Sequence, residues 1–200
     1  MTFIRYSHCC AGDLWYKAAQ SIILKGEMHL ENAEKVLLQD ERVQRVIEQE
    51  LSGTKKPWKQ GDFEHTEILG LVRKTSSGYK IATQMYTEII PRILTNGYFQ
   101  TEKLNPALYF DSNKRIKITS VLQDFNRFYK ENIDSWTNYT IYKESAIPLL
   151  LFGYLAKIID SSGRIQYIPG DNSILLSIDL PLDGSWVFPK QREVIQIKLA

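Results

Sequence analysis

The chain has 200 residues, which is enough for one or two domains, and 44% of them are hydrophobic, which is enough for a packed core. Its formal net charge of +2 excludes a strong overall field that would attract nucleic acid. No run of about 18 apolar residues occurs, so no membrane-spanning helix is expected. The first residues are too polar for a signal peptide, and the only cysteines are the neighbours Cys9 and Cys10, so we expect reduced thiols and a cytoplasmic location.

Helical patterns dominate the first quarter of the chain. Apolar residues recur at helical spacing over 14–23, and Asp13 is suited to cap that helix. Residues 30–51 are rich in charges and have one apolar stripe at helical spacing. Gly53 lies just past the end of this pattern, where it can end a helix. Aspartate is a preferred N-cap, so Asp40 favours a break within this pattern. We therefore expect two consecutive helices that meet at Asp40.

The next stretch has the element order of a winged helix. A short helix capped by Asp62 and ended by Gly70 is followed by two strands, 71–74 and 79–82, around a tight turn. A further helix is predicted over 84–94. Two helices followed by a β-hairpin are typical of winged-helix folds, many of which read DNA.

The helix that would enter a DNA groove argues against that function. It carries three acids over residues 62–67 and neither arginine nor lysine. Phosphate contacts need positive charge, so the sequence favours a structural or protein-docking role over DNA reading. Basic residues near the hairpin keep a nucleic-acid-binding winged helix open as the alternative: Lys55, Lys56, Lys59, Arg73, Lys74 and Lys80.

Two helices are predicted in the second half of the chain. Thr119 or Ser120 is suited to cap the first, and Trp136 and Tyr139 are expected to cover the loop after it. The second, over 147–159, is apolar on nearly every side. A helix of that composition is buried, so we expect it at the centre of the core.

Three strands complete the prediction, two of them over 164–169 and 173–181 and the third at the β-branched end of the chain. The fold class is therefore α+β. We divide the chain into a helical and winged-helix domain, a linker without periodicity, and a C-terminal α/β module: 1–97, 98–118 and 119–200.

Several stretches, in the same order, resemble the AAA-like ATPase family of bacteria, and of cyanobacteria in particular. One of them is Met85-Tyr86-Thr87-Glu88-Ile89-Ile90-Pro91-Arg92. The others are residues 42–47, 51–53, 69–73, 78–82, 125–129, 142–144 and 149–151. The resemblance covers nearly the whole chain, from about residue 14 to its end.

The resemblance implies a multidomain ATPase whose phosphate-binding domain precedes this region. The Gly-x-x-x-x-Gly-Lys-Ser/Thr phosphate loop of such a domain does not occur in this sequence, so we expect no ATP binding. Without that domain, the resemblance implies that this chain consists of lid helices, a winged helix and a truncated PD-(D/E)XK nuclease-like module.

In that module the resemblance implies a degenerate site. The family's metal-binding aspartate falls on Leu175, and its second acid is an amide, Gln196. Glu144 and Lys198 remain, so the vestigial candidates are Glu144, Gln196 and Lys198. Mg²⁺ needs several oxygen ligands, so we expect no catalysis and no cofactor, with Mg²⁺ only if this vestigial site is active.

The function expected from these features is a non-catalytic accessory or remnant module that binds a protein, possibly a P-loop ATPase subunit. Nucleic acid is expected to bind weakly or nonspecifically at most, and no membrane contact is expected. The alternatives are a nucleic-acid-binding winged-helix protein and, less favoured, a residual Mg²⁺-dependent nuclease.

Overall fold

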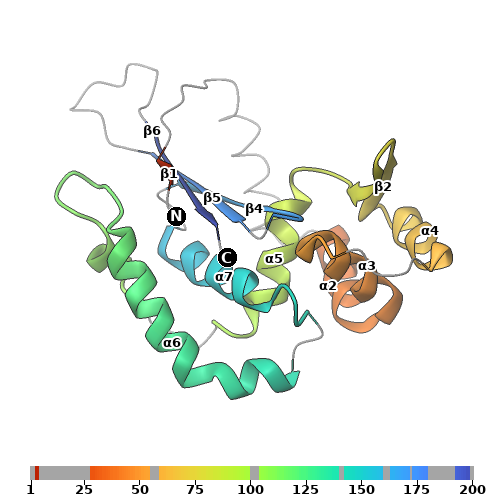
Figure 1. The fold of residues 1–200 in the computed structure, drawn as a ribbon, viewed down its shortest axis with the longest axis horizontal. Coiled ribbons are helices and arrows are strands. Elements are labelled where there is room, and N and C mark those ends of the chain that lie inside the picture. The colour runs from red at the N-terminus through yellow and green to blue at the C-terminus, as the bar shows by residue number, and fades with distance from the viewer. Residues whose placement is uncertain are drawn as a thin grey trace.

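The computed structural model describes residues 3–4, 28–54, 59–99, 104–139, 142–159, 163–171, 173–179 and 192–198. Within these ranges the chain forms six α-helices, one 3-10 helix and six strands, which confirms the α+β class (Figure 1). Some sequence predictions lie outside the described residues: the helix over 14–23 with its cap Asp13, the pair Cys9 and Cys10, and the cations Lys55 and Lys56.

The first two described helices meet as predicted. Helix α2 (Met28–Gln39) ends one residue before Asp40, and α3 (Glu41–Ser52) begins directly after it. The Asp40 carboxylate accepts a hydrogen bond of 2.9 Å from the backbone N–H of Arg42, so it caps α3. Gly53 ends α3 in the left-handed conformation, with φ of 72°, where glycine has no steric penalty.

Helix α4 (Gln60–Ile68) begins two residues before the predicted cap. Lys59 holds the N-cap position, and Asp62 lies in the first turn of the helix. The prediction of Asp62 as the cap was wrong because this carboxylate is buried against α3, where the guanidinium Nε of Arg45 donates to it at 2.9 Å. This ion pair instead ties α4 to α3.

The β-hairpin follows as predicted, to within one residue. Strand β2 (Val72–Thr75) pairs antiparallel with β3 (Gly78–Ile81), and Arg73 lies opposite Lys80. The rings of Phe63 and Tyr79 pack with their centroids 4.9 Å apart, which fastens the hairpin to α4.

Helix α5 (Tyr86–Asn96) leads away from the hairpin toward the sheet. The region predicted as a linker contains the 3-10 helix η1 (Pro106–Tyr109) and an isolated bridge between Phe110 and Ile116. Tyr109 and Ile116 are buried, so this segment packs against its neighbours.

Helix α6 (Ile118–Tyr139) is longer at both ends than predicted. It begins at Ile118, so neither Thr119 nor Ser120 is its cap, and the N–H of Val121 already bonds to the carbonyl of Lys117. It continues through Trp136 and Tyr139, which were expected to cover the loop after the helix. An amphipathic pattern predicts a helix better than it predicts its ends, because the end residues have few tertiary contacts.

The larger sheet has the order β1-β6-β5-β4, with every neighbouring pair antiparallel. Its strands are β4 (Gly163–Ile168), β5 (Ser173–Asp179), β6 (Arg192–Lys198) and the short β1 (Phe3–Ile4). Strand β1 comes from a stretch for which no strand was predicted. It has two residues, too few for a periodic signal, and only the pairing with β6 defines it.

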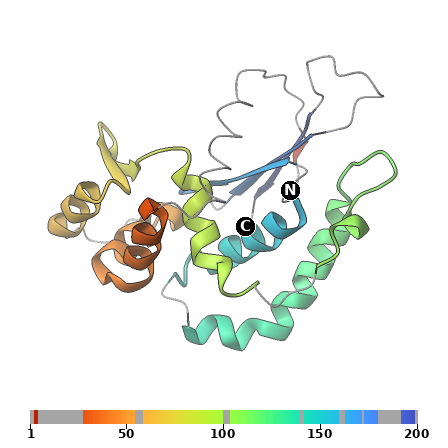
Figure 2. The same ribbon diagram turned by 180° about the vertical axis from the view of Figure 1, so that it is seen from behind.

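Helix α7 (Ala146–Ile159) lies against one face of the sheet, and α6 lies on the far side of α7 (Figures 1 and 2). Its central position in the core was predicted from its composition and is confirmed, because nearly all of its side chains are buried. Buried side chains from α2, α3 and α5 belong to the same cluster as those of α7 and the sheet. The division into 1–97, 98–118 and 119–200 stays a prediction. Among the described helices none is long and apolar enough to cross a bilayer.

Candidate functional site

Strands β5 and β6 present two different faces. Ile174, Leu176, Ile195 and Ile197 are buried, whereas Leu175, Gln196 and Lys198 alternate with them and belong to the opposite face. In the antiparallel register Leu175 is directly opposite Gln196. The structure therefore brings together the two positions at which the resemblance implies metal-binding acids.

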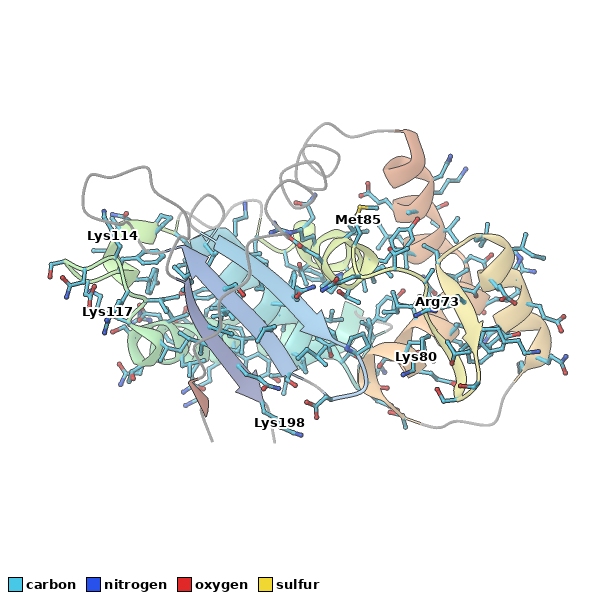
Figure 3. All side chains as sticks on the ribbon, turned by 90° about the horizontal axis from the view of Figure 1, so that it is seen from above. Arg73, Lys80, Met85, Lys114, Lys117 and Lys198 are labelled. Carbon is cyan, nitrogen blue, oxygen red and sulfur yellow. The ribbon has the colours of Figure 1, made fainter. Side chains whose placement is uncertain are left out.

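Lys198 ends this row of side chains and has an ion-pair partner. Its Nζ lies 2.5 Å from Oδ1 of Asp171, in the turn between β4 and β5. The hydroxyl of Ser173 donates to the other Asp171 oxygen at 2.6 Å, and the amide nitrogen of Gln196 lies 3.4 Å from that hydroxyl. Figure 3 shows Lys198 at this end of the sheet.

The hydrogen bonds from Lys198 and Ser173 hold the pKa of Asp171 below its usual range. Asp171 is therefore ionised at neutral pH and compensates the charge of Lys198.

Glu144 lies at a different place, in the turn before α7. The hydroxyl of Thr54, just after α3, donates to its carboxylate. Its backbone N–H donates to Oε1 of Glu48 at 2.7 Å, and the N–H of Ser145 donates to the same oxygen at 3.3 Å. The bonds that hold Glu144 thus join α3 to the start of α7.

Glu48 is a feature that our sequence reasoning missed. Its side chain is 6% exposed, and burial raises its pKa, with the nearby Glu144 acting in the same direction. Its second oxygen, Oε2, is buried without a hydrogen-bond partner in the described structure, as is the hydroxyl of Ser145. A signal was present, because Glu48 lies one turn after Gln44 and one turn before Leu51 and Ser52, on the buried side of α3.

More bonds join α3 to the sheet at the same junction. The hydroxyl of Tyr167 on β4 and the N–H of Gly170 both donate to the carbonyl of Leu51, at 3.3 and 3.1 Å. A Cβ atom on Gly53 would lie 2.7 Å from the carbonyl oxygen of Gly170. The backbones touch here, and only glycine fits at Gly53.

The hairpin and α4 form a second candidate surface. Arg73, Lys74 and Lys80 are exposed on the two strands. Helix α4 exposes Glu64 and also Ile68, whose side chain is 84% exposed. Cations therefore gather on the hairpin, whereas the helix beside it exposes an acid and an apolar side chain.

Metal ligands do not gather in the part of the chain that the structure describes: it contains no group of three histidine, cysteine, aspartate or glutamate side chains placed to hold an ion. Comparisons with models of protein families, with curated proteins and with solved structures each found no match. The resemblance to AAA-like ATPases stays a prediction.

Proposed function

We propose that this chain is a non-catalytic accessory module that binds a protein partner in the cytoplasm and corresponds to the C-terminal part of an AAA-like ATPase. In this proposal α3, α4 and the β2–β3 hairpin form a winged-helix half, and α7 with β4, β5 and β6 forms a truncated PD-(D/E)XK-like module. The order of the elements supports it, since two helices and a hairpin precede a core helix and three antiparallel strands.

The main support for a non-catalytic role is the pairing of Leu175 with Gln196. Mg²⁺ is held by few protein carboxylates, so each one matters to its affinity. Here a leucine and a neutral amide stand side by side where the resemblance implies two acids. Lys198 is engaged by Asp171, and Glu144 is held by Thr54 at the junction with α3. These contacts support a role without nucleic-acid cleavage. The residues present do not fit a Mg²⁺ ion.

The exposed side of α4 supports a protein partner. In a winged helix the helix before the hairpin is the one that would enter a DNA groove. Its outward side chains include Gln60, Glu64 and Ile68. Two polar side chains, one of them acidic, and one isoleucine do not attract a phosphate backbone, whereas an exposed apolar side chain with a polar rim is typical of protein interfaces.

The second candidate function is nucleic-acid binding, which the three exposed cations of the hairpin favour. It is tested by titrating labelled duplex DNA at about 150 mM salt, where we expect a Kd no tighter than the nonspecific range of about 10⁻⁴ to 10⁻⁶ M. Sequence-selective binding in the nanomolar range would put this function first.

The protein partner is tested by placing a photo-cross-linking amino acid at residue 68 in the protein expressed in its own host. We expect a P-loop ATPase among the cross-linked products, because Ile68 is the most exposed large apolar side chain of α4. The matched control is residue 147 on α7, where the isoleucine is 44% exposed and far along the chain from α4. Cross-links to nucleic acid alone, or equal yields at residues 68 and 147, would contradict the proposal.

A further inference from the structure

We propose that the β2–β3 hairpin is the docking surface for an acidic segment of the protein partner, with Arg73 and Lys80 as its principal contacts. This inference rests on the proposed function, because it names the chemistry of the partner. It concerns the hairpin, a different surface from the exposed side of α4.

The two cations lie directly opposite each other. The register of the hairpin pairs Arg73 with Lys80, so their side chains leave the same face of a two-stranded ribbon. Both side chains are exposed. Figure 3 shows them on the hairpin, at the opposite end of the molecule from Lys114 and Lys117.

Like charges directly opposite on paired strands destabilise the pair. Nothing in the described part of the chain neutralises Arg73 and Lys80 through an ion pair. Glu50 on α3 interacts electrostatically with Lys80, but burial raises the pKa of Glu50 to about 7, which weakens it as a negative partner near neutral pH. The free protein thus retains a repulsion that a bound acidic segment would remove.

The neighbouring helix decides between an acidic peptide and a DNA duplex. Oε1 of Glu67 accepts a bond of 3.2 Å from the backbone N–H of Lys74, so α4 lies beside strand β2. Glu64 is exposed one turn earlier on α4. A duplex presents phosphates over a broad surface and would meet these acids, whereas a single extended segment contacts the hairpin alone.

The test uses a fluorescein-labelled peptide of alternating glutamate and serine, titrated with the purified full chain and followed by anisotropy. We expect binding that weakens as salt is raised, because exposed charges are screened. Arg73→Glu should weaken it about tenfold, since reversing one charge both removes an attraction and adds a repulsion. Lys117→Glu, which makes the same change far from the hairpin, should leave it unchanged.

A thermal melt of the same variants separates a docking role from a structural one. Arg73→Glu places opposite charges across the hairpin, so we expect its Tm to equal or exceed that of the wild type while peptide binding falls. A lowered Tm together with lost binding would mean that Arg73 supports the fold, and would overturn the proposal.

Three results of the titration would also overturn it: no binding of the acidic peptide, equal loss in Arg73→Glu and Lys117→Glu, or tighter binding of a single- or double-stranded oligonucleotide through the same residues. The titration uses the purified protein alone. Its failure is therefore distinct from a failure of the cross-linking at residue 68, which tests the proposed function itself.

Discussion

Glu50 lies in the last turn of α3, half-buried, and burial raises its pKa to about 7 while nearby Lys80 lowers it. In the unfolded chain the group titrates near its ordinary value of 4.5. The folded protein therefore binds the proton more tightly. The stability from this linkage is full below about pH 4.5 and is lost as the pH rises toward 7.

We predict that Glu50→Gln removes part of the loss of stability with rising pH. The variant therefore gains stability relative to the wild type as the pH is raised from about 4.5 to above 7. Urea unfolding at a series of pH values measures it. Glu41→Gln, an exposed acid in the first turn of the same helix, is the control and should keep the decline. An identical pH profile for Glu50→Gln and the wild type would show that Glu50 is not buried as described.

For single residues, the sequence was informative where a side chain contacts residues close to it in the chain. Asp40 was predicted as a cap, and its carboxylate does bond to the N–H two residues on. The role of Asp62 was predicted wrongly and that of Glu48 was missed, because their partners are distant in sequence: Asp62 meets Arg45, and Glu48 meets Glu144. Tertiary contacts of this kind leave no periodic trace in a single sequence.

Helices α5 and α7 approach each other closely at Gly153. A Cβ atom there would lie 2.6 Å from Cε2 of Phe99 and 2.7 Å from Oγ1 of Thr95. Such a contact forces side chains or backbone to shift, which typically costs about 1–3 kcal/mol.

We therefore predict that Gly153→Ala destabilises the protein, although alanine is the better helix former. Gly61→Ala in α4 is the matched control, because nothing lies within 4 Å of its Cβ position, and it should stabilise by about 0.5–1 kcal/mol. Chemical denaturation of both variants tests the pair. Stabilisation by both would mean that α5 and α7 do not pack as closely as described.

Helix α7 is the most buried element, and Leu151 on it is fully buried. Leu151→Ala should cost about 2–5 kcal/mol of unfolding free energy, because the cavity cannot collapse completely in a packed core. Ile147→Ala, at an exposed position one turn earlier, should change it by less than about 0.5 kcal/mol. A loss below about 1 kcal/mol for Leu151→Ala would place α7 at the periphery.

The elements themselves were largely predictable. The two helices that meet at Asp40, the hairpin and the apolar core helix each follow from a local pattern. Strand β1 and the full length of α6 do not, because a two-residue strand has no period and a helix end is set by its surroundings.

The described part of the molecule is held together by a buried cluster and by the junction of α3 with α7 and the sheet. Glu48, Tyr167 and the contact of Gly53 with Gly170 all lie there. The sequence suggested a linker between two domains, and it did not indicate which residues meet at this junction, since the bonded residues are about half the chain apart. The same limit applies to the candidate site: the amide at Gln196 was visible, but the ion pair of Lys198 with Asp171 was not.

We propose that the sheet face bearing Leu175, Gln196 and Lys198 does not perform metal-dependent cleavage. The direct measurement is a time course of single- and double-stranded DNA incubated with the purified protein in millimolar Mg²⁺ or Mn²⁺. We predict no cleavage above that of a Lys198→Ala control, because neither the leucine nor the neutral amide that are paired here supplies a carboxylate ligand for the ion. Cleavage by the wild type that Lys198→Ala or Glu144→Ala abolishes would show that this face is a nuclease site.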